Sequence, residues 1–199
     1  QIINLQPEHI SSYCLTIEDK TALSSWVKSG KITPQSEDKQ SDQFELLIKV
    51  LALHGYEQYE ISNFAKESKY AVHNSNYWKA EEYLGIGPSA HSYDGENRRW
   101  NVSNNTLYIK NIGVNNDWFT IEKLSLENKW NELFLTGLRT KWGVLKTDIN
   151  QLGGFSEKEL ILIDRLLVQG LLLEDEISYI LSVSGKIKAD GIASDFFRV

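Results

Sequence analysis

The sequence contains no methionine and a single cysteine, Cys14, among its 199 residues. One cysteine excludes an internal disulfide framework. It also excludes a zinc site or an iron–sulfur cluster held only by cysteines of this chain, because such sites need several thiolates. Since even an initial methionine is missing, we expect the chain to be a piece of a longer protein.

Long apolar runs are also missing. The sequence therefore predicts no transmembrane helix, and no signal peptide opens it. The net charge of −6 and the pI near 5.3 argue against nucleic acid or an anionic membrane surface as a major partner. The proportions of apolar and charged residues are those of a globular protein that can bury a sizeable core.

The first part of the chain predicts an α/β arrangement. Residues 8–15 and 56–61 are rich in β-branched and aromatic types and predict two buried strands. Residues 37–54 predict the helix between them, because Ser36 can cap its start and Gly55 can end it. Strand, helix and strand at this spacing are typical of a parallel crossover, whose ligands bind at the carboxyl ends of the strands.

The second part predicts a hairpin followed by a helical module, and we expect the domain boundary between residues 120 and 121. The hairpin comprises residues 83–93 and 98–102, with residues 94–97 as its turn. The later elements are helices over 105–112, 125–140, 147–152 and 156–169, strands over 171–174 and 178–183, and a last helix capped by Ser184. From residue 125 on, this order is that of a winged-helix-like module.

The charge of that module decides between two interpretations. Residues 125–199 hold nine Lys or Arg and eleven Asp or Glu, a net charge of −2, and the predicted wing carries Glu174, Asp175 and Glu176. These carboxylates would repel phosphate. The module is therefore interpreted as structural or protein-contacting, with no nucleic acid as partner.

Residues 59–101 hold the chemistry best suited to a ligand. The stretch includes Y-E-I-S-N-F-A, H-N-S-N-Y-W, Y-L-G-I-G-P-S-A-H-S and R-R-W-N, with two of the four histidines, His73 and His91. Closely spaced glycines let a ligand or another backbone approach, and histidine with aromatic rings suits a flat, conjugated ligand. On composition alone, aromatic residues that pack only against one another explain the same pattern.

Together with H-I-S-S-Y-C-L-T-I-E near the start and L-T-G-L-R-T-K-W-G-V near residue 140, these motifs resemble the oxygen-independent coproporphyrinogen III oxidase-like family. More narrowly they resemble its HemW branch of heme chaperones. The resemblance covers essentially the whole chain. It implies an α/β fold: the C-terminal part of an incomplete radical-SAM (β/α) barrel, followed by a mostly helical winged-helix-like C-terminal domain.

The family's members use S-adenosyl-L-methionine (SAM) and a [4Fe–4S] cluster on a Cys-x3-Cys-x2-Cys motif. No such motif occurs in this sequence. The resemblance therefore implies SAM, the cluster and heme for the longer protein, whereas this chain alone should be catalytically inert and hold neither cluster nor SAM. No catalytic residue and no metal ligand is assigned within it.

The resemblance also implies cofactor-binding positions. Thr16 follows the barrel strand whose end lies against SAM, and a glycine-rich segment closes the site over SAM through Gly85, Ile86, Gly87, Ala90 and His91. The oxidase branch has an apolar residue where His91 stands, and this difference favours the chaperone branch.

The H-N-x-x-Y-W motif, at His73, Asn74, Tyr77 and Trp78, implies a heme contact. Neutral imidazole can ligate heme iron, and the two aromatic rings can cover the macrocycle. Alternatively, His73 is a hydrogen-bonding residue that fixes a loop after residues 56–61. His9 suits a strand start, and His54 suits the C-terminal end of a helix.

Three functions follow as alternatives. The chaperone branch implies a cytoplasmic protein that binds heme and transfers it to a heme-accepting protein, which could be membrane-associated. The oxidase branch implies oxidative decarboxylation of coproporphyrinogen III propionates. The third alternative is a non-catalytic winged-helix interaction module. Because a truncated barrel would leave the strand at residues 8–15 with an open edge, we also expect self-association into a homo-oligomer.

Overall fold

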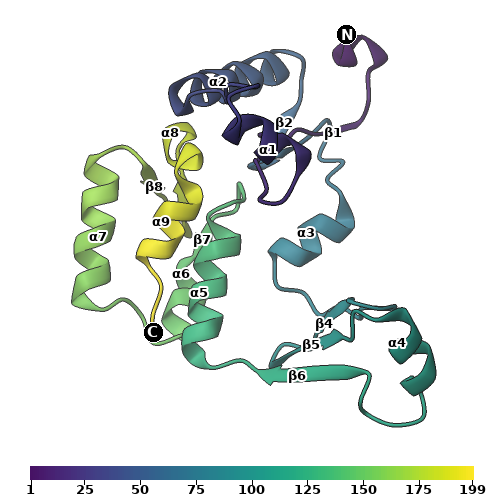
Figure 1. The fold of residues 1–199 in the computed structure, drawn as a ribbon. Coiled ribbons are helices and arrows are strands. Elements are labelled where there is room, and N and C mark those ends of the chain that lie inside the picture. The colour runs from purple at the N-terminus through teal and green to yellow at the C-terminus, as the bar shows by residue number, and fades with distance from the viewer. The chain divides into compact units, whose positions relative to one another are not determined.

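The computed structural model describes residues 1–199, which form two compact units, Gln1–Tyr70 and Ala71–Val199. Both mix helices with short antiparallel strands (Figure 1). The predicted domain boundary between residues 120 and 121 falls inside strand β6 (Phe119–Lys123). No helix is both long and apolar enough to cross a bilayer.

The first unit contains a three-stranded sheet and three helical segments. Its elements are η1 (Ile2–Leu5), β1 (His9–Ser11), α1 (Ala22–Lys28), α2 (Glu37–Leu53), β2 (Glu57–Glu60) and β3 (Asn63–Ala65). The strand order is β1-β3-β2, and both pairings are antiparallel. Because both run antiparallel to β3, strands β1 and β2 are parallel to each other, as the predicted crossover requires, but they are not neighbours in the sheet. The chain reverses at Ile61 and Ser62, and β3 inserts between β1 and β2.

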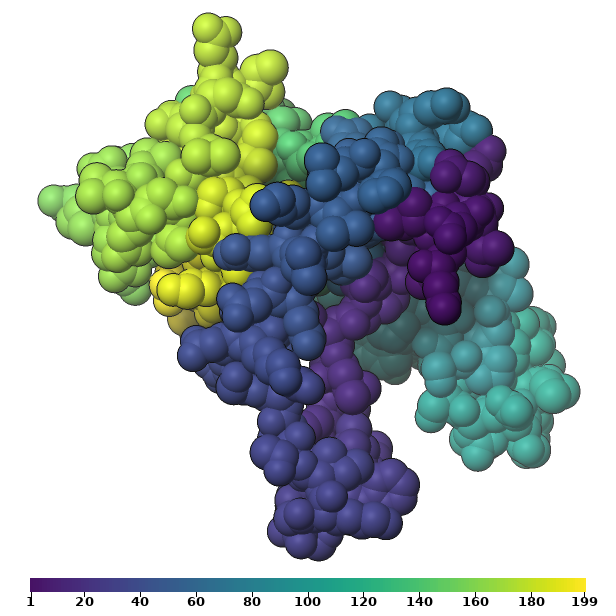
Figure 2. Space-filling view, turned by 90° about the horizontal axis from the view of Figure 1, so that it is seen from above, coloured from purple at the N-terminus to yellow at the C-terminus, as the bar shows by residue number.

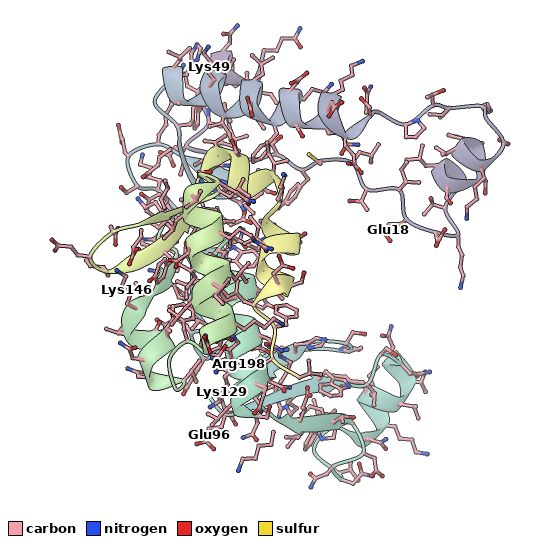
Figure 3. All side chains as sticks on the ribbon, turned by 90° about the vertical axis from the view of Figure 1, so that its left-hand side faces the viewer. Glu18, Lys49, Glu96, Lys129, Lys146 and Arg198 are labelled. Carbon is pink, nitrogen blue, oxygen red and sulfur yellow. The ribbon has the colours of Figure 1, made fainter.

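The predicted buried strand over residues 8–15 is also too long. Strand β1 ends at Ser11, and Tyr13 and Leu15 are largely exposed. The reason is its partner: β3 offers only three residues to pair with, so the ladder has little beyond Ser11 to bond to. The segment that carries α1 then projects away from the rest of this unit, as Figures 2 and 3 show, with Glu18 on the projection.

Helix α2 holds the sheet in place. Its predicted cap is confirmed, because the Ser36 side chain accepts a hydrogen bond from the Lys39 amide. Its inner face brings Leu51 against Tyr56 and Phe64, all at most 3% exposed, and these three residues form the core of the unit. The Tyr56 hydroxyl donates to the Pro7 carbonyl at 2.6 Å, which ties the N-terminal segment to this core.

The second unit begins with α3 (Val72–Trp78) and a sheet of order β4-β5-β6. Strands β4 (His91–Tyr93) and β5 (Asn97–Asn101) form the predicted hairpin. Its turn is fixed by the Asp94 carboxylate, which accepts from the amides of Glu96 and Asn97. Helix α4 (Asn105–Asn111) lies between β5 and β6 in sequence, and β6 adds a third strand that the sequence did not predict.

The remaining elements have winged-helix order. They are α5 (Leu126–Gly137), β7 (Val144–Leu145), α6 (Lys146–Gln151), α7 (Glu157–Val168), β8 (Leu172–Glu174), β9 (Ser178–Leu181), α8 (Val183–Ile187) and α9 (Ala189–Asp195). The wing sheet has the order β7-β9-β8. Lys146, labelled in Figure 3, ties it to α6 through an ion pair with Glu174 and a bond to the Asp175 carbonyl.

The observed helix caps of this module are those predicted from the sequence, with one exception. Ser125 caps α5, and Ser156 with Glu159 forms a capping box on α7, as predicted. The predicted last helix is instead two helices, and Ser182 rather than Ser184 caps the first of them. Ser182 is favoured because it directly follows the last strand residue, where the backbone is still extended.

Candidate functional site

Nine of the ten predicted site residues belong to the second unit. Thr16 belongs to the first unit, where it is exposed and outside any helix or strand. The other nine fall on three neighbouring pieces of chain: helix α3, the glycine-rich loop that follows it, and strand β4.

The H-N-S-N-Y-W motif is a helix. Residues Val72–Trp78 form α3, so the predicted loop is wrong. The helix separates the motif into two faces, because residues four apart lie one above the other. His73 and Tyr77 are both exposed, whereas Asn74 and Trp78 are both partly buried. The motif therefore presents an imidazole and a phenol to solvent and turns an amide and an indole inward.

The two aromatic residues of α3 are held by further rings. Tyr77 makes an edge contact with Trp78 at 5.8 Å between ring centroids and a tilted contact with Tyr83 at 5.5 Å. Tyr83 continues the row to Tyr93 at 6.3 Å. Partial burial, helped by Tyr77, raises the pKa of Tyr83 above its ordinary value. The row fixes the orientation of Tyr77 while leaving nearly half of its surface open.

The glycine-rich loop after α3 is tightly bonded to the hairpin. A Cβ on Gly85 would lie 2.0 Å from the His91 carbonyl oxygen, so only glycine fits there. The Gly85 amide donates to Ser92 Oγ, and the Gly87 amide donates to the Tyr108 hydroxyl. Ile86, between these two bonded glycines, is 84% exposed. The loop therefore presents an apolar side chain on a backbone that is fixed on both sides.

Asn101 is the residue that closes this loop, and it was not among the predicted site residues. It is 2% exposed, and its Nδ2 donates to the carbonyls of Gly87 at 2.8 Å and Gly85 at 3.4 Å. Its amide N–H bonds to the Ala90 carbonyl, while its Oδ1 is buried without a partner. The only sequence indication was its place in the R-R-W-N motif.

His91 lies at the edge of an open cavity of about 520 Å³. Its ring stacks on Trp100, the cross-strand partner of His91, with the ring planes 29° apart. The other lining residues are Ser89, Asn101, Val102, Ser103, Asn104, Leu107 and Thr120. No charged side chain lines the cavity, so it suits the planar, uncharged part of a ligand better than an ion.

The four histidines differ in what their rings bond. His9 Nε2 lies 2.8 Å from the Tyr59 hydroxyl, and His54 Nδ1 lies 2.8 Å from the Val50 carbonyl oxygen. Partial burial lowers the pKa of His9. The rings of His73 and His91 are exposed and make no hydrogen bond. The interpretation of His73 as a hydrogen-bonding residue of a loop therefore does not match its place on α3.

These donors decide which metal-bearing groups fit the chain. A [4Fe–4S] cluster does not fit, because Cys14 is the only thiol and no group of three or more His, Cys, Asp or Glu lies together. A heme iron needs fewer protein ligands. The exposed imidazole of His73, with the Tyr77 ring one turn away on the same face, is a donor set that fits it.

Comparison with known proteins gives sequence relatives and a fold. No protein-family profile matches the chain. The heme chaperone HemW of Bacillus subtilis is 36% identical over 107 residues, which are 54% of this chain and 28% of that protein. HemW of Mycobacterium tuberculosis is 35% identical over 101 residues, 51% of this chain and 26% of that protein. The mitochondrial radical S-adenosyl methionine domain-containing protein 1 of Danio rerio is 36% identical over 91 residues, 46% and 20% of the two chains.

The same fold occurs in coproporphyrinogen III oxidase (HemN) from Escherichia coli, a radical SAM enzyme. The TM-score is 0.68 over 98% of this chain and 49% of that chain, with 18% sequence identity. The matched residues span about a quarter of the curated sequence relatives and about half of this solved structure.

Proposed function

We propose that this chain, which belongs to the radical SAM family of the heme chaperone HemW and the coproporphyrinogen III oxidase HemN, is the C-terminal part of a HemW-type heme chaperone. The relatives named as heme chaperones share 35–38% identity with it, whereas the oxidase structure shares 18%. Heme is the cargo in this proposal, and a second protein accepts it.

The observation that carries the proposal is the state of His73. Its imidazole is exposed and makes no hydrogen bond, while those of His9 and His54 are engaged in hydrogen bonds. A neutral ring nitrogen with a free lone pair is what iron needs. Tyr77, one turn along α3, is also exposed and is held by Trp78 and Tyr83, so its ring can lie against an apolar macrocycle.

The glycine-rich loop has a different part in the proposal. Its backbone is fixed by Ser92, Tyr108 and Asn101, and it borders the uncharged cavity through Ser89 and His91. We assign this side to the SAM-contacting part of the longer protein, with Gly85, Ile86, Gly87, Ala90 and His91 along it. Thr16 is assigned to the same role from the first unit.

The test is heme titration of the longer protein that contains this chain, followed at the Soret band. We expect His73→Ala to weaken binding about tenfold or more, which corresponds to about 1.4 kcal/mol. The matched control is His54→Ala, because that imidazole caps a helix and bonds a carbonyl. Equal losses for His73→Ala and His54→Ala would remove the role of the H-N-S-N-Y-W motif as a heme contact.

Coproporphyrinogen III oxidation is the second candidate, favoured by the shared fold of the solved oxidase. A turnover assay separates the two functions. The longer protein is supplied anaerobically with coproporphyrinogen III, SAM and a reductant. Under the chaperone proposal heme binds at His73 and no carbon dioxide is released. Stoichiometric vinyl product would favour the oxidase.

A winged-helix interaction module is the third candidate, and the order of elements α5 to β9 favours it. The wing turn is acidic because it carries Glu174, Asp175 and Glu176. Asp175 accepts from the amides of Ile177 and Ser178, and Glu174 is paired with Lys146. This chemistry favours a protein partner over DNA. Binding to duplex DNA at physiological salt, measured by fluorescence anisotropy, would contradict that preference.

A further inference from the structure

The end of helix α3 is joined to the segment that follows α5 by two reciprocal contacts. The Arg139 guanidinium carbon lies 5.4 Å from the ring centroid of Trp78, and Lys79 Nζ lies 4.7 Å from that of Trp142. Each segment thus provides one cation and one indole. Both distances fall within the range in which a cation is attracted to the negative face of an aromatic ring.

The segment of residues 139–142 is itself rigidly held by the winged-helix module. Arg139 Nη1 donates to Asp190 of α9 at 2.7 Å, so this arginine bridges α9 and Trp78. At the end of the segment, a Cβ on Gly143 would lie 2.2 Å from the Tyr179 carbonyl oxygen of the wing. Because the backbone packs this closely on strand β9, the segment cannot shift without moving the wing.

Helix α3 is short and has no side-chain cap at its start. It has seven residues, and its N-cap, Ala71, provides no side-chain hydrogen bond. A helix of this length is not stable in isolation, so its position depends on what its side chains contact. These contacts include that of Tyr77 with Tyr83 and those of Trp78 and Lys79 with the segment after α5.

We propose that Arg139 and Trp142 are positioning residues for His73. They hold the C-terminal end of α3 on the winged-helix module and thereby set the direction in which α3 presents its imidazole. The winged-helix module then acts on heme affinity without touching heme. This inference rests on the proposed heme contact of His73 and adds the residues that orient it.

The experiment compares Arg139→Ala with Arg139→Lys in the longer protein. Heme affinity is measured by Soret titration, and the position of the Soret band reports whether an imidazole still ligates the iron. We expect Arg139→Ala to weaken heme binding about five- to tenfold and to shift the band, and Arg139→Lys to restore part of both. Trp142→Leu should act like Arg139→Ala. The control is Arg165→Ala, whose ion pair with Asp195 is exposed and far from α3 in sequence.

A second readout does not need heme. Hydrogen–deuterium exchange of the amides of α3 in the heme-free protein should be faster in Arg139→Ala than in wild type or Arg165→Ala, because the end of the helix is released. A double variant checks the route: in a His73→Ala background, Arg139→Ala should weaken heme binding much less than it does alone.

The outcomes separate the two proposals. If His73→Ala weakens heme binding but Arg139→Ala changes neither affinity nor Soret position, the positioning role is overturned and the heme contact stands. If His73→Ala has no effect, the heme contact itself is wrong, and positioning falls with it. Unchanged exchange of α3 amides in Arg139→Ala would also overturn the positioning role.

Discussion

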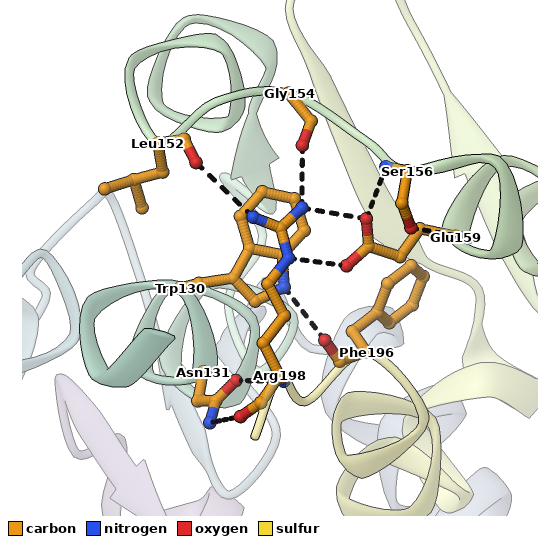
Figure 4. Close-up of polar contacts among 8 residues, drawn as sticks. All are labelled: Trp130, Asn131, Leu152, Gly154, Ser156, Glu159, Phe196 and Arg198. Carbon is orange, nitrogen blue, oxygen red and sulfur yellow. Dashed lines mark hydrogen bonds and ion pairs between the residues drawn. The ribbon is translucent and has the colours of Figure 1, made fainter. Parts of the chain in front are cut away.

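The guanidinium carbon of Arg198 lies 3.2 Å from the ring centroid of Trp130, a side chain with no exposed surface. Figure 4 shows how completely this arginine is used. Its Nε and Nη2 donate to the two carboxylate oxygens of Glu159, each at 2.8 Å, and Nη2 also donates to the Gly154 carbonyl. Asn131 bonds both the amide and the carbonyl of Arg198. The C-terminal residues therefore lock α5, α7 and the loop between α6 and α7 together.

Arg198→Ala should strongly destabilise the second unit. The substitution leaves the Glu159 carboxylate, whose side chain is 8% exposed, without its cation, and it removes the cover of Trp130. Removing one partner of a buried ion pair typically costs about 3 kcal/mol or more. Thermal and urea unfolding of the chain measure the loss. Arg165→Ala is the control, because both partners of its pair with Asp195 are more than half exposed, and it should change stability by at most about 0.5 kcal/mol.

Glu159 should make the stability of the second unit depend on pH. Burial raises the pKa of this carboxyl, but the hydrogen bonds from Arg198 and Ser156 lower it by more than burial raises it. The pKa therefore lies below its ordinary value of 4.5. A folded-state pKa below the unfolded one gives stability that is present above pH 4.5 and is lost as the pH falls through the folded pKa.

Glu159→Gln tests this sign. The variant keeps the side-chain shape but has no titrating group, so it should be less stable than wild type at pH 7, and the difference should shrink as the pH approaches 3. Urea midpoints at several pH values give the comparison. A difference that stays constant over this range would show that Glu159 is not ionised differently in the folded and unfolded states.

Local sequence features predicted the helices well. Ser36, Ser125 and Ser156 sit at helix starts because a short side chain that accepts a hydrogen bond from the helix amides is a local property of the sequence. Strands β3 and β7 and helix α3 were missed, as was strand β6. The first two have three and two residues, and they exist only because distant strands offer partners. Helix α3 has no capping side chain to mark its start.

The same limit applies to the site. The sequence identifies His73 and Tyr77 as candidates by their residue types. That they share an exposed face, opposite the inward face of Asn74 and Trp78, follows only from the helical structure of residues 72–78. Asn101 could not be singled out, because its contacts with Gly85 and Gly87 cross about fifteen residues of chain. Such contacts depend on the hairpin register, which residue composition does not specify.

Gly85→Ala should distort the glycine-rich loop. The new methyl group would lie 2.0 Å from the His91 carbonyl oxygen, so β4 or the loop must move. We expect a loss of about 2 kcal/mol or more in the free energy of unfolding, and a change in the fluorescence of Trp100, which stacks on His91. Gly113→Ala is the control: its φ of +74° is strained for alanine, but no atom lies within 4 Å, so about 1 kcal/mol is expected. Equal losses of stability in Gly85→Ala and Gly113→Ala would show that the close contact at Gly85 is relieved at no additional cost in free energy.

The last prediction concerns the open edge of β1, which stands at the end of the β1-β3-β2 sheet. The Ser12 amide bonds the Ser62 carbonyl, and the Glu8 carbonyl accepts from the Lys66 amide. Along an antiparallel strand, successive residues turn their backbone groups to alternate sides. Because Glu8 and Ser12 form their bonds on the β3 side, the backbone N–H and C=O of Ser11 point toward the open side. Unpaired strand edges recruit other strands, so the chain should self-associate at micromolar concentration through this edge.

Two proline substitutions, compared by sedimentation velocity, separate edge pairing from general unfolding. Ser11→Pro removes the outward N–H and the Ser11 Oγ hydrogen bond to Asn63 Oδ1, but it leaves the backbone bonds of β1 to β3, so it should lower self-association while the sheet is kept. Ser12→Pro removes an N–H that β1 uses within its own sheet, so it should lower the stability of the first unit instead. A wild-type chain that remains monomeric at tens of micromolar would refute the edge argument, because the short ladder of β1 would then be too small to recruit a partner.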